Sequence, residues 1–184
     1  RSIMVLNLSK NSLGDRGLSN LSLGLQSNVT LNTLDISCNN IGSGSSVETN
    51  CCGNTSTPNT SSTTKQSEWI VNFSNFLKVH KKIRHINIAD NLFSYKDVEL
   101  ICESFYSSTC QLESFNISSN PIGDLGMELL SLTLGSTNNA LPNLNSLKLT
   151  SINMGFHGIH SLANAFRCKG LSNVTILWID NNPN

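Results

Sequence analysis

One spacing of apolar residues recurs along the chain and predicts its secondary structure. In the first copy, Leu6 and Leu8 alternate with polar residues, Asn11 follows, and Leu21 and Leu25 lie four residues apart. Alternation at every second residue predicts a strand with one buried face, and a four-residue spacing predicts one apolar helix face. Each copy is therefore predicted to contain a short strand, a turn and a helix.

Six copies follow one another. The full order of a copy is L-x-x-L-x-L-x-x-N-x-L and then x-x-x-G-x-x-x-L-x-x-x-L, and some copies depart from it. The six copies begin at Ile3, Leu31, Ile83, Leu112, Leu144 and Val174. The third copy has Asp97 in place of the Gly, the fifth has Ile152 in place of the Asn, and the sixth contains only the strand. One copy cannot bury its own apolar face, so stacked copies are predicted to share a continuous core.

The fold class predicted from this repeat is α/β. The pattern resembles the leucine-rich repeat of the ribonuclease-inhibitor type, which implies a solenoid with a parallel sheet on its concave face and helices on its convex face. Residues 1–184 are interpreted as a fragment of one such solenoid, because neither terminal copy shows the polar cap that a solenoid end needs. In isolation, the fragment is expected to be poorly stable or prone to self-association.

Residues 43–66 interrupt the second copy and contain almost no apolar side chains. Such a segment buries too little surface to offset the entropy lost on ordering, so we predict a disordered surface loop. A species-specific insertion is the favoured interpretation, and a modification site or a partner-binding loop is the alternative.

A helix over residues 68–82 is predicted after this loop, with Ser67 as its N-cap. Cationic residues gather at its end, namely Lys78, His80, Lys81, Lys82 and Arg84. They complement the helix dipole, and a phosphate or lipid site is the alternative interpretation.

The composition excludes several classes of function. Charged residues make up 13% of the chain and the net charge is zero, so no basic field exists to hold nucleic acid. No apolar run reaches the length of a membrane span. The cysteines form no CxxC pair, which favours reduced thiols in a cytoplasmic protein. Eight N-x-S/T sequons occur, but Asn7 and Asn116 fall within predicted strands, where glycans would crowd the sheet.

No catalytic motif is present, and we predict no enzyme activity, cofactor or metal. His157 and His160 lie one helical turn apart, a spacing compatible with two metal ligands, yet no further ligand is evident. The pair Cys51 and Cys52 has no neighbour that would lower a thiol pKa. The aspartates Asp15 and Asp124 belong to the N-x-x-G-D turn and are predicted to be structural.

Alternation assigns the solvent-facing strand residues that would form a concave binding surface. They are Val5, Asn7, Ser9, Thr33, Asp35, Ser37, His85, Asn87, Ala89, Ser114, Asn116, Ser118, Ser146, Lys148, Thr150, Ile176, Trp178 and Asp180. The candidate partner-binding residues among them are Asp35, His85, Asn87, Asn116, Lys148, Ile176, Trp178 and Asp180. An exposed Trp is a typical hot-spot residue, although a further repeat covering Trp178 is the alternative.

The region from residue 112 to 184 contains four features in order: N-P-I-G-D-L-G at 120–126, a lengthened loop ending in L-P at 141–142, S-I-N-M-G-F-H-G at 151–158, and N-P at 182–183. In these features it resembles the CARMIL family of capping-protein-regulating leucine-rich-repeat proteins. The resemblance implies a scaffold within a cytoplasmic actin regulator near the plasma membrane. The membrane-binding, dimerisation and capping-protein-binding segments of that family would lie outside this chain.

Two other protein classes share the repeat. A signalling protein of the GTPase-activating or immune-sensor type would present a catalytic arginine, for which Arg16 is a weak candidate. An inhibitor of a secreted enzyme would need an acidic concave face for a basic target, whereas the face predicted here is near neutral.

Overall fold

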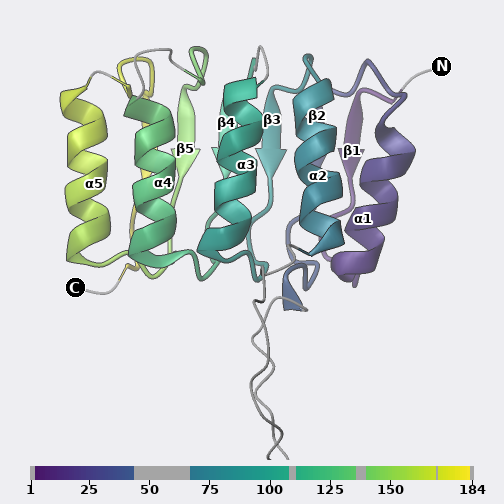
Figure 1. Cartoon of the computed structure of the whole chain (residues 1–184), viewed down its shortest axis with the longest axis horizontal. Coiled ribbons are helices and arrows are strands. Elements are labelled where there is room, and N and C mark those ends of the chain that lie inside the picture. The colour runs from purple at the N-terminus through teal and green to yellow at the C-terminus, as the bar shows by residue number, and fades with distance from the viewer. Residues whose placement is uncertain (1–2, 44–66, 108–110, 136–139, 169, 183–184) are drawn as a thin grey trace, which may run out of the picture.

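Strands and helices alternate strictly in the part of the chain that the computed structural model describes, residues 3–43, 67–107, 111–135, 140–168 and 170–182. The strands are β1 (Val5–Asn7), β2 (Thr33–Asp35), β3 (His85–Asn87), β4 (Ser114–Asn116), β5 (Ser146–Lys148) and β6 (Ile176–Trp178). The helices are α1 (Gly14–Leu25), α2 (Glu68–Val79), α3 (Tyr95–Ser107), α4 (Gly123–Gly135) and α5 (Phe156–Arg167). Figure 1 shows the row of helices in front of the row of strands. The predicted loop at 43–66 lies, apart from Ser43, outside the described residues.

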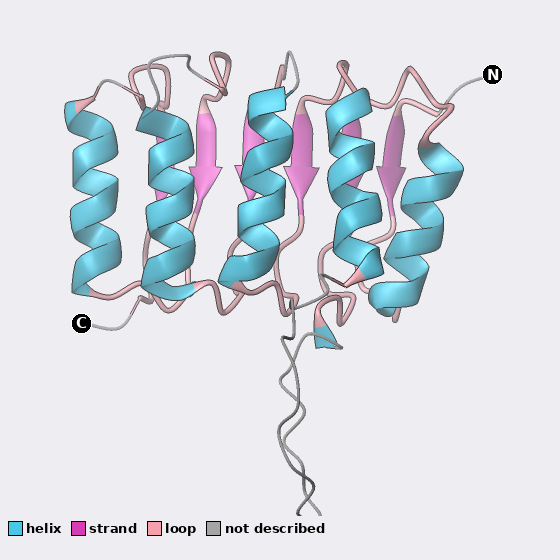
Figure 2. Ribbon diagram, viewed as in Figure 1, coloured by secondary structure: helices cyan, strands magenta, loops and turns pink. Residues whose placement is uncertain are grey.

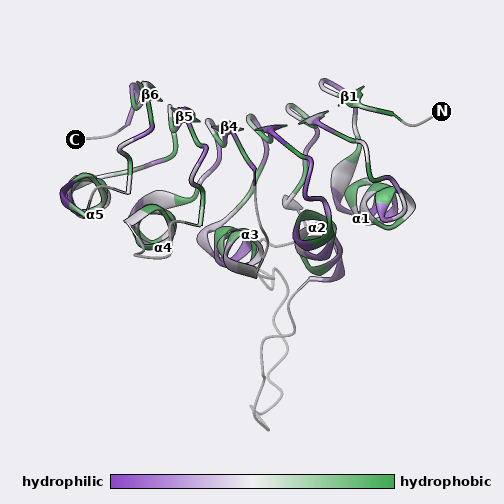
Figure 3. Ribbon diagram, turned by 90° about the horizontal axis from the view of Figure 1, so that it is seen from above, coloured by the Kyte–Doolittle hydropathy of each residue, from purple (hydrophilic) through white to green (hydrophobic). Residues whose placement is uncertain are grey.

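The strands form one parallel sheet in sequence order, from β1 to β6. Its register aligns the same repeat position in every copy, so that Leu34 of β2 pairs with Ile86 of β3, and Ile86 with Phe115 of β4. All helices cover the same side of the sheet (Figure 2). Parallel strands lie about 5 Å apart and packed helices about 8–10 Å apart, so the sheet takes the inner side of the curve. Figure 3 shows this concave sheet and the convex helix row, as predicted.

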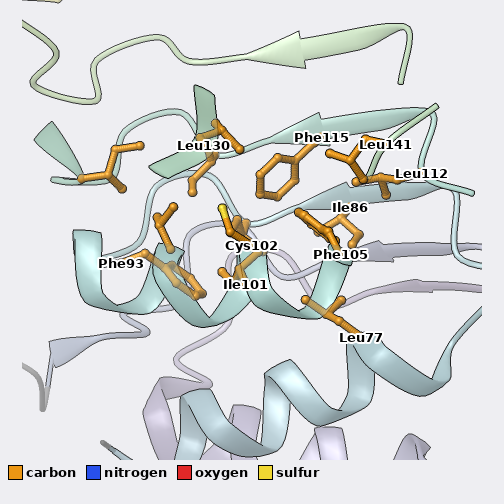
Figure 4. Packing of buried hydrophobic residues seen from close by; sticks show 14 of the residues in the cluster. Leu77, Ile86, Phe93, Ile101, Cys102, Phe105, Leu112, Phe115, Leu130 and Leu141 are labelled. Atoms are coloured by element: carbon orange, nitrogen blue, oxygen red, sulfur yellow. The ribbon is translucent and has the colours of Figure 1, made fainter. Parts of the chain in front are cut away.

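The apolar core lies between the sheet and the helices (Figure 4). Phe105 of α3 meets Phe115 of β4 edge to face, with ring centroids 5.8 Å apart. The same repeat positions are less covered in the terminal copies. Ile179, for example, is 42% exposed, whereas its counterpart Leu149 in the fifth copy is completely buried.

The Asn residues that recur at one position of the repeat form a ladder of amide groups. The side-chain amide nitrogens of Asn39, Asn91, Asn120 and Asn182 donate to backbone carbonyls of the preceding copy at 2.9–3.0 Å. Their Oδ1 atoms accept backbone N–H groups from the same preceding copy. The ladder thus satisfies buried polar groups at each turn. The aliphatic side chain of Ile152 cannot extend it, so the ladder is interrupted in the fifth copy.

After every strand, the residue directly before the ladder position lies in the left-handed region. These residues are Lys10, Cys38, Asp90, Ser119, Ser151 and Asn181, with φ between 52° and 58°. A non-glycine residue in this region costs about 1–2 kcal/mol. In the copies with a ladder asparagine, the bonds of that asparagine offset the cost. This repeated turn was not predicted from the sequence.

The helix after the insertion is shorter than predicted. It ends at Val79, because His80 adopts φ −89° and ψ 81° and leaves the helical region. Lys81 and Lys82 therefore lie beyond the helix. Ser67 occupies the N-cap position as predicted, but its side chain makes no capping hydrogen bond. His80 is buried, not exposed, and its ring centroid lies 4.1 Å from that of Phe76.

Candidate protein-binding surface

The sheet brings the predicted partner-binding residues to one solvent-facing surface. Strand register aligns Asn7, Asp35, Asn87, Asn116, Lys148 and Trp178 in a single row across β1 to β6. A second row contains His85 and Ile176, separated by the strands β4 and β5. None of the eight predicted residues is buried. They do not form one cluster, however, because Asp35 and His85 lie far along the sheet from Trp178.

Three residues predicted to face solvent are buried instead, namely Ser37, Ala89 and Ser146. All three have small side chains, so little of their surface rises above the larger side chains of the same sheet face. The hydroxyl of Ser37 donates to the Asp35 carboxylate at 2.7 Å. The accessible concave surface is therefore smaller than alternation alone predicts.

Most polar side chains of the N-terminal half are already engaged within the sheet. Asp35 Oδ1 accepts the backbone N–H of Ser37, and Asp35 Oδ2 accepts the side-chain amide of Asn87 at 3.0 Å. Asn87 and Asn116 each accept the backbone N–H two residues later, from Ala89 and Ser118. These bonds fix the side chains as turn-forming groups, which leaves them less capacity to bind a partner.

The C-terminal half of the surface is more open and more apolar. Trp178 is 53% exposed and Ile176 is 47% exposed. The Lys148 ammonium lies 5.3 Å from the Trp178 ring centroid, a distance suited to a cation–π contact. Beside them, the Thr150 hydroxyl donates to the Asp180 carboxylate at 2.8 Å. We call Lys148, Ile176, Trp178 and Asp180 the tryptophan patch.

The side chains that the sequence offers as metal-binding, redox or catalytic candidates do not form a reactive site among the described residues. His157 and His160 are exposed on α5, and the described residues contain no group of side chains suited to a metal ion. Burial raises the pKa of the Cys102 thiol to about 11, so this group stays protonated near neutral pH. Arg16 is exposed on α1. The pair Cys51 and Cys52 lies outside the described residues.

Asp15 and Asp124 have the structural role that the sequence predicts. Asp15 Oδ1 accepts the backbone N–H of Gly42, and Asp124 Oδ1 accepts the N–H groups of Gly155 and Gly158. Each carboxylate therefore binds the backbone of the following copy and joins two repeats.

A groove between α4 and α5 on the convex face was not predicted. Its volume is about 520 Å³, and its lining includes Tyr106, Leu132 and Cys168. The sequence has a second apolar stripe on α4, formed by Leu125, Leu129 and Leu132 at positions i, i+4 and i+7, of which Leu132 lines this groove. Leu125 and Leu132 are exposed, whereas Leu129 is partly buried and packs against the core.

The repeat register and the layer arrangement agree with the known proteins that the chain resembles. The family model described as "Leucine Rich repeat" matches residues 1–22, 27–44 and 110–131. The fold is a leucine-rich-repeat solenoid. The solenoid is similar to the solved structure titled "Leiomodin-1 Actin-Binding Site 2 (ABS2)". The match covers 92% of this chain and 84% of the leiomodin chain, with a TM-score of 0.54 and 12% sequence identity. No curated protein sequence matches the solenoid. None of its described helices is both long and apolar enough to cross a bilayer.

Proposed function

We propose that the solenoid is a non-catalytic scaffold that binds a protein partner through the tryptophan patch on its concave face. The observation that carries the proposal is the exposure of Trp178 beside Ile176, with Lys148 over its ring. An aromatic side chain of this size contributes large contact area with few rotatable bonds, and Trp is enriched among interface hot spots. The cation–π contact holds the ring in place before binding, which lowers the entropy lost in the complex.

We further propose that the partner belongs to the actin-regulatory machinery of the cytoplasm, as in a CARMIL-type regulator. Two findings support this class. The sequence from residue 112 to 184 resembles the CARMIL repeats, and the solved structure named as an actin-binding site of leiomodin-1 shares the fold. The concave surface, with few charges, suits a partner recognised by apolar contact more than one recognised by electrostatic steering.

Binding of the chain to filamentous actin, to monomeric actin and to capping protein tests both parts of this proposal. Trp178→Ala should weaken the complex by about tenfold or more, as expected for a hot-spot residue. The matched control is Phe156→Ala, which removes an exposed aromatic ring from the helix side of the solenoid. Both variants should unfold at the same temperature as the parent chain, since both rings are largely exposed.

The possible outcomes test the binding surface and the class of partner separately. Loss of binding in the Phe156 variant, with normal binding in the Trp178 variant, would place the interface on the convex face and contradict the tryptophan patch. Absence of binding to all three probes would contradict the actin-regulatory class.

A further inference from the structure

A cluster of cations lies at the edge of the solenoid where α2 leads into β3. Four of the 12 lysines and arginines of the chain fall within residues 78–84, namely Lys78, Lys81, Lys82 and Arg84. The loops that lead from helix to strand form the upper edge of the molecule in Figure 1. The cluster is therefore separate from the concave tryptophan patch and from the convex helix surface.

The dipole of α2 accounts for only one of these cations. Lys78 lies in the last turn of the helix, where a positive charge is favourable. Beyond it, the carbonyl of Phe76 already accepts the backbone N–H of His80, and the carbonyl of Val79 accepts that of Lys81. The helix end thus has no need of Lys81 and Lys82.

The lysines of the cluster take part in no ion pair with another described residue, so they are available to bind an anionic partner. Arg84 forms an ion pair with Glu113, so its charge is compensated. Among the described residues this is the one ion pair at the edge, and Lys81 and Lys82 are exposed. Among the described residues, the ammonium groups of Lys78, Lys81 and Lys82 therefore have no carboxylate partner, and the three lysines lie within residues 78–82 at this edge.

Exposed apolar side chains lie beside these charges. Val79 is 56% exposed and is flanked by the lysines, and Val29 in the preceding helix-to-strand loop is 71% exposed. The two loops are joined, because the backbone N–H groups of Arg84 and His85 donate to the carbonyl of Asn32. We call Val29, Lys78, Val79, Lys81 and Lys82 the lysine edge.

We infer that the lysine edge is a docking surface for an anionic lipid bilayer. Each lysine near such a surface contributes roughly a fivefold gain in binding, and the bilayer interface accepts the valine side chains at the same time. An acidic protein segment suits the edge less well, since its carboxylates would meet the lysines but offer no apolar surface to the exposed Val29 and Val79. Docking at this edge leaves the concave face free for a protein partner.

Sedimentation of the chain with lipid vesicles tests this inference. The chain should bind vesicles of phosphatidylserine mixed with phosphatidylcholine, and bind pure phosphatidylcholine vesicles far less. The double variant Lys81→Gln, Lys82→Gln should lower the partition coefficient roughly twenty-five-fold, since two fivefold contributions multiply. Val79→Ser should cause a smaller loss, and high salt should weaken binding by the parent chain.

Lys96→Gln is the matched control, because Lys96 is an exposed lysine in the first turn of α3 at the opposite edge. It should bind like the parent chain. Equal binding to both kinds of vesicle, equal losses in the control and the double variant, or no vesicle binding would each overturn the inference. Saturable binding of polyglutamate in place of vesicles, lost in the double variant, would assign the edge to an acidic protein segment. Inorganic phosphate that displaces the vesicles completely at physiological concentration would assign it to a free anion.

Discussion

The carboxylate of Asp124 at the start of α4 accepts the backbone N–H of Gly158 in the first turn of α5, at 2.8 Å. The same oxygen accepts the N–H of Gly155 at 2.6 Å. Gly155 occupies the N-cap position of α5 and has no side chain to cap it. Asp124 therefore replaces the missing cap from the neighbouring repeat, and its negative charge lies at the positive end of the helix dipole.

Asp124→Ala should accordingly destabilise the chain by about 1–2 kcal/mol, the usual cost of losing a charged cap. Urea denaturation measures the loss, and hydrogen exchange should show faster opening of α5 than of α2. Glu128→Ala is the control, since Glu128 is an exposed carboxylate on the same helix. Similar losses in the two variants would show that capping is not the cause.

The interrupted amide ladder leads to a second prediction. Ile152 and Ile117 are both fully buried, but only Ile152 occupies the position of the ladder asparagines. An Asn there would lie within reach of polar backbone groups, as Asn120 does when it donates to Ile117 and Ser118. An Asn at position 117 would be buried among apolar side chains without a partner.

We therefore expect Ile152→Asn to change the free energy of unfolding by no more than about 1 kcal/mol, and Ile117→Asn to lower it by about 3 kcal/mol or more. Thermal unfolding of the two variants under the same conditions gives the comparison. Equal destabilisation would mean that the fifth turn cannot accommodate a ladder amide.

Asp97 occupies the position where the first, fourth and fifth copies have Gly, and the third prediction concerns its charge. Burial of Asp97 raises the pKa of its carboxyl above the ordinary value of 3.8, although the Ser94 hydroxyl and backbone N–H oppose this shift. A carboxyl whose pKa is raised on folding favours the folded state below its unfolded pKa. This contribution is lost as the pH rises through the folded pKa.

Asp97→Asn should therefore raise the melting temperature at neutral pH, because Asn keeps an acceptor for Ser94 without a buried charge. The gain in melting temperature should disappear below about pH 4, where the Asp97 carboxyl is protonated in both the folded and the unfolded chain. Calorimetry across this pH range measures the difference. Glu99→Gln, an exposed carboxyl on the same helix, should show no comparable gain. A constant difference between Asp97→Asn and the parent chain at every pH would contradict the assignment to charge.

The alternation of apolar and polar residues was enough to assign most side chains of the concave surface, but not to tell which of them are exposed to solvent. The sequence placed Lys148 and Trp178 on the same face of the sheet. Their cation–π contact depends on the register between β5 and β6, which joins residues 30 positions apart. Likewise, Ser37, Ala89 and Ser146 occupy positions that alternation assigns to solvent, but they are buried once the copies are stacked.

The sequence by itself determined the repeat, the order of strands and helices, the ladder asparagines and the apolar face of each element. These features follow from the two- and four-residue periods of strand and helix, which are local properties of the chain. The tertiary structure decided where α2 ends, why His80 is buried, which carboxylate caps which helix, and how open the tryptophan patch and lysine edge are. Those features arise from contacts between successive copies, whose geometry depends on how the strands and helices stack in space.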